Sequence, residues 1–247
     1  MRGLFVTGTD TGVGKTVLSA ALLAALAADG ERVRAHKPAV TGLDEPPADG
    51  LDGQTWPPDH ELLAAAAAMA SEDVAPLRYG PAVSPQLAGE LAGDPPARER
   101  MLDAAQTALA LTAGDDQTSA TLIVEGAGGL LSPLADELTV CDLAAALRLP
   151  LLIAARPGLG TINHTLLTLQ SARAAGLTVR AVVLTPWPGE PSRLELSNRE
   201  TIERLGFVEV AGLPLAAGPD LDELARIGAS LPWRRWLGMP AAVRQPA

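Results

Sequence analysis

Short apolar runs alternate with longer helical ones along most of the chain. Six runs have the continuous hydrophobicity of strands that are covered on both faces, at residues 4–8, 32–42, 121–129, 151–158, 178–185 and 207–215. Seven segments have helical composition, and several begin at Asp, Ser or Thr and end near Gly: residues 15–28, 59–70, 97–113, 139–148, 161–175, 195–205 and 221–228. This alternation predicts an α/β fold with a mostly parallel sheet and helices on both faces.

Residues 43–58, between the second predicted strand and the second predicted helix, are rich in Pro, Gly and Asp. They predict a surface loop and not a domain linker, because strands continue after them. A chain of 247 residues is ordinary for one α/β domain, and it contains no internal repeat. We therefore expect a single domain over residues 1–247.

Charge and cysteine content narrow the classes of partner. With 29 acidic and 19 basic residues the net charge is −10, and no Lys/Arg cluster offers a surface for phosphate backbones, so we expect no nucleic acid. We expect no signal peptide, because Met1 and Arg2 lead straight into an apolar strand with no cleavable segment, and no membrane span, because the apolar stretch 141–155 is interrupted by Asp142 and Arg148. The single cysteine, Cys141, excludes an intrachain disulfide and is expected to be a small core residue. A cytoplasmic location fits this composition best.

The sequence GTDTGVGKT at residues 8–16 stands between the first predicted strand and the first predicted helix, which is the context of a P-loop, a phosphate-binding loop. Five residues, 9–13, separate the first Gly from the Gly-Lys pair, whereas the usual loop has four. Glycines let backbone N–H groups converge on phosphate oxygens, Lys15 adds a positive charge, and the Thr16 hydroxyl can bind Mg²⁺. A structural strand-to-helix turn is the alternative. The expected nucleotide contacts are Gly8, Asp10, Thr11, Gly12, Val13, Gly14, Lys15, Thr16 and Val17.

Carboxylates elsewhere in the chain are candidates to complete a metal site. Glu125 follows four apolar residues at the carboxyl end of a predicted strand, where doubly wound sheets assemble their sites; a solvated glutamate is the alternative. Asp59 stands where a helix N-cap is expected, so capping alone would also explain it, and Asp52 competes for the same role. We expect Thr16, Asp59 and Glu125 to bind Mg²⁺. Three glycines after Glu125 permit close approach of a ligand, unless they merely form a tight turn: Gly126, Gly128 and Gly129.

Four segments together resemble the dethiobiotin synthetase family: GTDTGVGKT, KPAVTG at residues 37–42, VEGAGGLLSPL at 124–134 and GTINHTLLTL at 160–169. The resemblance spans residues 1 to about 214, and the family has the same lengthened phosphate loop, so the extra residue indicates a specialised loop. The resemblance implies an ATP-dependent cyclo-ligase of biotin synthesis, in which 7,8-diaminopelargonate takes up CO₂ to form a carbamate. The carbamate then attacks the γ-phosphate of ATP, or of another nucleoside triphosphate, and the second amine closes the ring of dethiobiotin.

This chemistry brings an anionic carbamate to an anionic phosphoryl group, so it needs cations around both. Lys15, Lys37 and Mg²⁺ would meet this need; Lys37 follows RVRAH at a strand end, with a solvated lysine as the alternative. In the family, hydroxyls at the positions of Thr11 and Thr41 orient the amine or carbamate. The alternative for each residue is a purely structural role in a turn. We assign catalysis to Lys15, Lys37 and Thr11, and expect residues 9–11 to extend past the phosphates towards the second substrate.

The far end of diaminopelargonate is a carboxylate on an apolar tail. In the resembling family this group meets a helix start from the neighbouring subunit of a homodimer, and free N–H groups would provide the anion site. The implied contacts are Gly160, Thr161, Ile162 and Asn163, and His164 is then a packing or interface residue. Residues 81–87, PAVSPQL, resemble the family's segment near the amine end, with contacts from Pro81 and Ser84; a proline-rich loop is the alternative.

Base recognition departs from the family pattern. Members that recognise adenine often have an Asn after the strand that here ends VVL, whereas this chain has Thr185 followed by PWPGEP. Thr185 and Pro186 therefore predict weak discrimination between bases, because a hydroxyl rotates to suit either pattern and proline has no N–H. Candidates to flank the base instead are Leu213, Pro214 and Leu215. Asn198, in LSNRE, is interpreted as a helix-start residue.

Two other classes share this nucleotide fold. An amidotransferase-linked synthetase, such as cobyrinic acid a,c-diamide synthase, needs a glutaminase region with a nucleophilic Cys, and Cys141 lies in no such setting. A partitioning or septum-positioning ATPase carries an extra Lys near the start of its loop, where this chain has Thr9, Asp10 and Thr11, and it needs a basic face or an amphipathic tail. We keep this regulatory P-loop ATPase as the alternative function.

Overall fold

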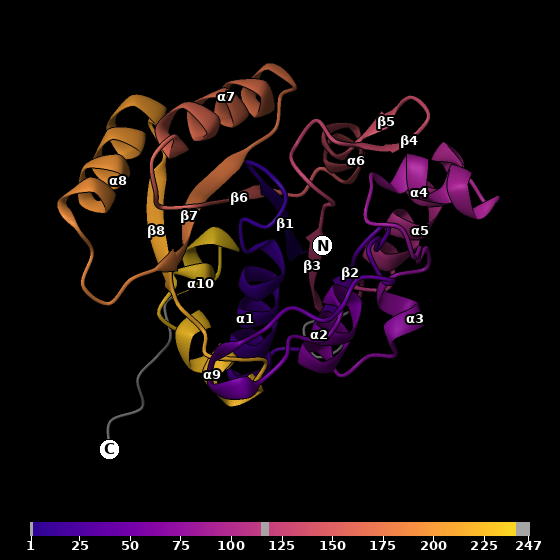
Figure 1. Ribbon diagram of the computed structural model, residues 1–247, viewed down its shortest axis with the longest axis horizontal. Helices are drawn as coiled ribbons and strands as arrows, with labels where there is room; N and C mark the ends of the chain where they lie inside the picture. Colours follow the sequence, from indigo (N-terminus) through magenta and orange to yellow (C-terminus); the bar gives the residue numbers. More distant parts are fainter. Residues whose placement is uncertain (1, 115–118, 241–247) are drawn as a thin grey trace.

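Six strands form one parallel sheet in the computed structural model, which describes residues 2–114 and 119–240 apart from the side chain of Asp52. Neighbouring strands follow the order β2-β3-β1-β6-β7-β8 (Figure 1). Because the chain moves to one side of β1 and then to the other, ligands are expected at the carboxyl ends of the strands beside β1. The bounds are β1 Arg2–Gly8, β2 Val33–His36, β3 Thr121–Glu125, β6 Leu151–Ala155, β7 Val179–Trp187 and β8 Glu209–Pro214.

Helices cover both faces of the sheet, because alternate residues of each buried strand point to opposite faces. Leu4 and Val6 of β1 belong to a core with α1 (Lys15–Ala28), α2 (Asp59–Ala67), α9 (Leu221–Gly228) and α10 (Trp233–Trp236). Phe5 faces the other side, where α5 (Arg98–Ala110) and α6 (Val140–Leu147) pack. On that same face α7 (Thr161–Ala174) and α8 (Arg193–Gly206) cover β6, β7 and β8. Within the described residues, no helix is both long and apolar enough to cross a membrane.

The predicted fold class is confirmed, and each of the six predicted strands is present. The helices α1 and α9 have the predicted bounds, and the other predicted helices differ at their ends by at most three residues. The predicted strand 32–42 is wrong after His36. Pro38 has no N–H for a strand ladder, and the N–H groups of Lys37 and Val40 instead donate to Val74 O and Leu77 O, both at 2.9 Å.

Sequence patterns missed several short elements: η1 (Leu51–Gly53), α3 (Ser71–Val74), α4 (Pro85–Ala92), α10, and the antiparallel pair β4 (Pro133–Ala135) and β5 (Leu138–Thr139). Residues 81–87, for which a proline-rich loop was the alternative, form a loop only as far as Ser84, because α4 begins at Pro85. Ser84 is its N-cap, with Oγ accepting from Leu87 N at 3.5 Å, and Pro85 is its first residue, where proline is well tolerated.

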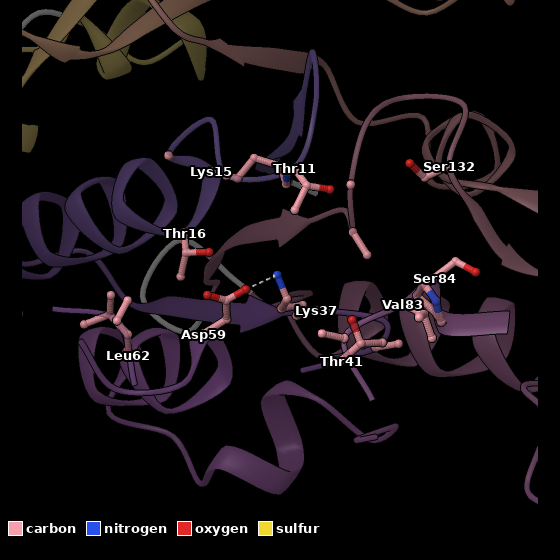
Figure 2. A pocket seen from close by; sticks show the side chains of 18 of the residues that line it. Thr11, Lys15, Thr16, Lys37, Thr41, Asp59, Leu62, Val83, Ser84 and Ser132 are labelled. Carbon is pink, nitrogen blue, oxygen red and sulfur yellow. Dashed lines mark ion pairs between the residues drawn. The ribbon is translucent and has the colours of Figure 1, made fainter. Parts of the chain in front are cut away.

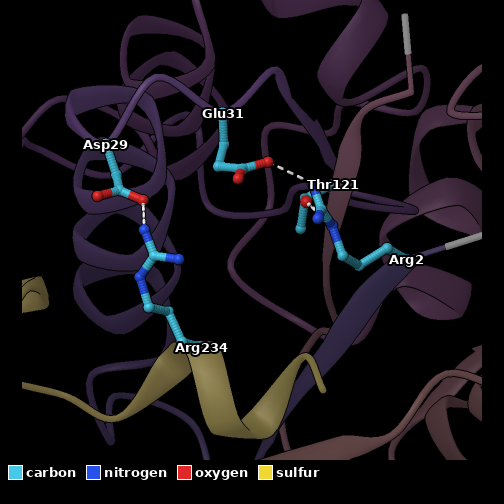
Figure 3. A network of polar contacts seen from close by, with 5 residues as sticks. All are labelled: Arg2, Asp29, Glu31, Thr121 and Arg234. Atoms are coloured by element: carbon cyan, nitrogen blue, oxygen red, sulfur yellow. Dashed lines mark hydrogen bonds and ion pairs between the residues drawn. The ribbon is translucent and has the colours of Figure 1, made fainter. Parts of the chain in front are cut away.

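Polar contacts fasten both ends of the described chain near the end of α1, as Figure 3 shows. Arg2 forms an ion pair with Glu31 and donates from Nε to Thr121 Oγ1 at 2.7 Å. Arg234 of α10 forms an ion pair with Asp29, directly after α1. The C-terminal segment thus braces the helix that carries the phosphate loop.

Candidate active site

Glycines give the loop between β1 and α1 its shape. Gly12 and Gly14 have φ values of 66° and 84°, which residues with side chains rarely adopt. A Cβ on Gly8 would lie 2.7 Å from the Val13 side chain, and one on Gly14 would lie 2.8 Å from Cγ2 of the buried Thr185. The loop is therefore closely packed on both sides, and larger residues at these positions would displace it.

Hydrogen bonds hold the remaining backbone of the loop. The Thr9 N–H donates to Ala154 O of β6 at 3.0 Å, and Asp10 Oδ1 accepts from the Thr11 N–H at 2.7 Å. Lys15 Nζ donates to Asp10 O at 2.9 Å, so the ammonium group lies against the loop's own backbone. This arrangement collects N–H donors and a positive charge at the start of α1, which favours a bound anion.

A compact cluster of charges lies beside the loop, where β2, β3 and α2 meet (Figure 2). Lys37 Nζ is 2.8 Å from Asp59 Oδ2 and also forms an ion pair with Glu125 Oε1. The Thr16 hydroxyl donates to the same Glu125 oxygen at 2.9 Å. Lys37 is 4% exposed and Glu125 is 1% exposed, whereas the side chain of Asp59 is 46% exposed. The cluster therefore reaches from the core to the surface.

The charges of this cluster set one another's protonation. Burial alone would lower the pKa of Lys37, but the Asp59 and Glu125 carboxylates more than offset it and hold the pKa above its usual range. Loss of hydration opposes ionisation of Asp59, but the Lys37 ammonium lowers the pKa of that carboxyl. Burial, which outweighs the attraction of Glu125, lowers the pKa of Lys15. Lys37 is thus held as a cation.

The predicted N-cap role of Asp59 is wrong by one position. Pro58 is the N-cap of α2 and Asp59 is its first residue, with no side-chain capping bond. Its carboxylate instead binds Lys37, which is the arrangement expected of a site residue. The competing residue, Asp52, has its side chain outside the described part of the structure.

The oxygen atoms of the cluster fit a magnesium ion. Mg²⁺ prefers carboxylate, hydroxyl, phosphate and water oxygens, and Thr16, Asp59 and Glu125 supply the first two kinds. The buried Glu125 Oε2 has no hydrogen-bond partner among the described residues, so it is free to accept one. Over the same residues no group of three or more His, Cys, Asp or Glu side chains forms a metal site. An ion here would therefore depend on the two carboxylates together with hydroxyl, phosphate and water oxygens.

A cavity of about 720 Å³ lies over this cluster and the phosphate loop. The expected site residues that line it are Thr11, Gly12, Gly14, Lys15, Thr16, Val17, Lys37, Thr41, Asp59, Ser84 and Gly128. Glu125 lies beneath it and reaches it through Thr16 and Lys37. Segments far apart in the sequence thus form one site at the carboxyl ends of β1, β2 and β3.

Comparisons with known proteins show the family of this chain. A family model described as an AAA domain matches residues 2–217. An ATP-dependent dethiobiotin synthetase from Anaeromyxobacter dehalogenans strain 2CP-1 is 40% identical, covering 94% of this chain and 96% of its own. Proteins of the same name from Bacillus subtilis strain 168 (36% identical; 86% and 87% covered) and Mycobacterium sp. strain KMS (38% identical; 88% and 90% covered) are also similar. The chain belongs to the dethiobiotin synthetase family.

Solved structures with the same fold come from proteins with other names. A MinC:MinD cell division protein complex from Aquifex aeolicus aligns with 99% of both chains at a TM-score of 0.54 and 13% identity. A complex of a Cyanothece McdA variant with ATP aligns with the same coverage at a TM-score of 0.51 and 11% identity. At such low identity these likenesses show the fold that dethiobiotin synthetases share, and nothing about the reaction.

Several of the predicted site residues lie outside the cavity of this single chain. Leu213 is fully buried in the core, so its side chain offers no surface to a base, whereas Leu215 is half exposed. The rest are adjoining backbone or lie in other segments: Gly8, Asp10, Val13, Pro81, Gly126, Gly129, Gly160, Thr161, Ile162, Asn163, Thr185, Pro186 and Pro214.

The interpretation of Asn198 as a helix-start residue is wrong. Ser192 is the N-cap of α8, and Asn198 lies inside that helix, buried against the neighbouring loop. Its amide nitrogen donates to Pro157 O at 2.9 Å and to Gly158 O at 3.1 Å. This interaction fixes the loop that leads into α7, the helix whose start the dethiobiotin synthetase resemblance assigns to substrate.

Sequence reasoning missed part of the cavity wall. The missed residues are Ala39, Ala48, Trp56, Pro57, Leu62, Ala82, Val83, Pro85, Ala127, Ser132 and Pro133. Most are small or apolar and carry no chemical signal. Trp56 is the exception, because a tryptophan three residues before a candidate metal ligand is a signal that could have been read.

Proposed function

We propose that the protein is an ATP-dependent dethiobiotin synthetase that closes a cyclic urea on 7,8-diaminopelargonate with CO₂. Membership of the family gives the reaction, and the observation that carries the assignment is the cluster of Lys15, Thr16, Lys37, Asp59 and Glu125 around one cavity. Two ammonium groups, a hydroxyl and two carboxylates are the set that a phosphoryl transfer between anions requires.

The reaction proceeds in three steps. One amine nitrogen bonds to the carbon of CO₂ and loses a proton, which gives a carbamate. A carbamate oxygen attacks the γ-phosphorus, and the bond from that phosphorus to the β-phosphate oxygen breaks to release ADP. The second amine nitrogen then bonds to the carbamoyl carbon, loses a proton and expels phosphate, which leaves with the electron pair of the broken C–O bond.

Charge neutralisation is the main contribution of the side chains. Lys37 stays protonated because of Asp59 and Glu125, so it can meet both the carbamate and the γ-phosphoryl group. Lys15, held at Asp10 O, covers the phosphates from the other side. Bound at Thr16, Asp59 and Glu125, Mg²⁺ would neutralise charge on the phosphate oxygens. The protein has little covalent chemistry to perform, and positioning determines the rate.

Hydroxyl groups at the end of the cavity away from Leu62 suit the diamine (Figure 2). Thr11, Thr41 and Ser84 line this part, and each hydroxyl can accept a hydrogen bond from an amine. A Cβ on Gly128, in the turn after β3, would collide with Ser132 Oγ, so glycine lets this turn pack beside the hydroxyl-lined region. We assign the amine end of the substrate to this region.

The carboxylate end requires a second copy of the chain, so we propose a homodimer. The start of α7, residues 160–163, does not line the cavity of its own chain. Large apolar side chains are exposed on and beside α7, among them Leu159 at 92% in the turn before the helix and Leu167 at 56% within it, which suits burial between subunits. Each active site would then consist of the phosphate loop of one subunit and the α7 start of its partner, and we propose a cytoplasmic location for the enzyme.

The decisive test is to incubate the protein with Mg-ATP, bicarbonate and diaminopelargonate and to measure dethiobiotin by mass. We expect one dethiobiotin, one ADP and one phosphate per turnover, and none when the diamine is omitted or when Lys15→Ala replaces the wild type. Phosphate release that ignores the diamine but responds to DNA or lipid vesicles would instead support the regulatory ATPase.

A further inference from the structure

One arm of the cavity is apolar and contains an indole ring. We define this arm by five uncharged residues that line the cavity, Val17, Ala48, Trp56, Pro57 and Leu62, of which Leu62 belongs to one core cluster and Val17 and Trp56 pack against it. Figure 2 shows that Leu62 lies at the end of the cavity away from Ser84 and Ser132, with Lys37 and Asp59 between the two ends. The apolar arm is therefore distinct from the hydroxyl-lined region that we assign to the diamine.

The apolar arm adjoins the phosphate loop at the start of α1. Thr16 and Val17 follow Lys15 in the first turn of this helix, so a nucleotide whose phosphates bind the loop would extend past Val17. Val17 and Trp56 are both partly buried and pack against the same core cluster, which also contains Ala216, two residues after β8.

Trp56 is held in place by its own loop and by the segment after β8. The backbone N–H of Trp56 donates to Ala48 O at 2.8 Å, and the backbone N–H of Leu51 donates to Ala217 O at 2.9 Å. A Cβ on Gly50 would lie 3.4 Å from Trp56 Nε1 and 3.2 Å from Ala217 O, so the indole packs beside this junction. The loop of residues 43–58 thus bridges the charged cluster around Lys37 and the end of β8.

Few polar groups in this part of the chain can read a base edge. Thr185 is buried against Gly14, and Pro186 has no backbone N–H. A purine or pyrimidine ring in this position needs an apolar surface of matching shape, and an indole supplies one, because bases stack on aromatic side chains irrespective of their identity.

We propose that Trp56 is the stacking platform for the nucleobase of the triphosphate substrate, an assignment that rests on the proposed function. Contact with the base makes Trp56 a determinant of nucleotide affinity, and the same contact makes it tolerant of different bases.

The test compares the binding of Mg-ATP with that of Mg-tripolyphosphate, which has the phosphates but no base, by titration calorimetry. Trp56→Ala should weaken ATP binding about ten- to hundredfold, the usual effect of losing one base stack, and change tripolyphosphate binding less than about twofold. Trp56→Phe should stay within about threefold of wild type for both probes, because a ring remains. Leu51→Ala is the matched control in the same loop, since its half-exposed side chain lies outside the cavity.

Unchanged ATP affinity in Trp56→Ala overturns the proposal, and so does an equal loss for both probes, which would mean that Trp56 only supports the loop. Should that variant fail to fold, the fluorescence of wild type minus that of Trp56→Phe isolates one of the four tryptophans. ATP but not tripolyphosphate should quench this difference, and absence of quenching overturns the proposal. Failure of the wild type to form dethiobiotin would be a separate result that refutes the proposed function.

Discussion

Replacing Lys37 by methionine is the sharpest perturbation of this site, because it removes the charge and keeps most of the side-chain length. The ammonium group bonds to Glu125, which is buried, and lies 2.8 Å from Asp59. After the substitution Glu125 retains the Thr16 hydroxyl as a hydrogen-bond partner, and its charge remains in the core. The variant therefore tests stability and catalysis through the same atom.

The stability effect follows from the burial of the partners. Removing one member of a buried ion pair costs about 3–5 kcal/mol, because the remaining charge is left uncompensated. Asp59 is half exposed and water can solvate it, so we expect the lower end, about 3 kcal/mol. Adding Glu125→Gln to Lys37→Met removes the unpaired charge and should restore about 2 kcal/mol. Arg100→Met, which breaks the exposed pair with Asp94, is the matched control and should cost less than about 1 kcal/mol.

The catalytic effect should be separable from this loss. Under conditions where urea denaturation shows Lys37→Met to be folded, dethiobiotin formation should fall about 10²- to 10³-fold in kcat, the usual cost of one charge that stabilises a transition state. Binding of ATP should change less than about threefold, because Lys15 and the loop N–H groups remain. The Glu125→Gln addition should leave kcat low even where stability returns.

Turnover within about tenfold of wild type in folded Lys37→Met would refute the catalytic assignment. A stability loss no larger than that of Arg100→Met would refute the reasoning from burial. The two measurements are independent, so either part can fail alone.

Three further predictions concern the base, the dimer and pH. Because Thr185 and Pro186 supply few base-reading groups, kcat/KM for GTP, CTP and UTP should lie within about tenfold of that for ATP, and a preference for ATP above about a hundredfold would contradict this. Equal mixing of Lys37→Ala with Asn163→Asp should recover about a quarter of wild-type activity through hybrid dimers with one intact site, whereas an active monomer in sedimentation would exclude shared sites. Burial lowers the pKa of His36 to about 4, so the unfolded chain binds the extra proton first and stability should fall by about 3 kcal/mol as pH drops from about 6.5 to 4. In urea denaturation, the free energy of unfolding of His36→Gln should fall less steeply with decreasing pH than that of wild type. The exposed His164→Gln is the control, and a pH dependence of His36→Gln equal to that of wild type would contradict the prediction.

The parts of the site that could be predicted are those set by local backbone or by strand register. The phosphate loop was predictable because its glycines are required by its conformation. Lys37 and Glu125 are 88 residues apart in the sequence. In the parallel register of β2 and β3, His36 pairs with Val124, so the residues that follow this pair, Lys37 and Glu125, also lie side by side. A strand end followed by a charged residue is visible in the sequence, and the meeting of two such ends follows from a parallel sheet.

The parts that could not be predicted depend on long-range packing. Asn198 holds Pro157 O and Gly158 O only because α8 packs beside that loop, and nothing near Asn198 in the sequence specifies the neighbour. Trp56 lines the cavity because its loop bonds to Ala217, which comes 161 positions later in the chain. Loops are positioned by tertiary contacts and not by propensity, so their side chains are the least predictable walls of a site.

One compositional signal was available in the sequence. Lys15 and Lys37 are the chain's two lysines, and every other basic residue among its 19 Lys and Arg is an arginine. Arginine cannot replace lysine where a compact ammonium must lie between two carboxylates, as Lys37 does, or against a single carbonyl, as Lys15 does. The use of lysine at these two positions alone indicates that the shape of the side chain, in addition to its charge, is needed there.

The additional residue of the phosphate loop can be understood from the neighbours of residues 9–11. Arg156 donates to Thr11 O at 3.2 Å from the side of β6. On the other side, a Cβ on Gly128 would lie 3.7 Å from Thr11 Oγ1, and one on Gly129 would lie 3.6 Å from Thr9 O. This part of the loop therefore spans the distance from β6 to the glycine turn after β3, which borders the hydroxyl-lined end of the cavity. We infer that the additional residue forms a boundary between the nucleotide and the diamine, so that the two substrates meet only where the carbamate reaches the γ-phosphoryl group. A loop that binds a nucleotide alone does not require such a boundary.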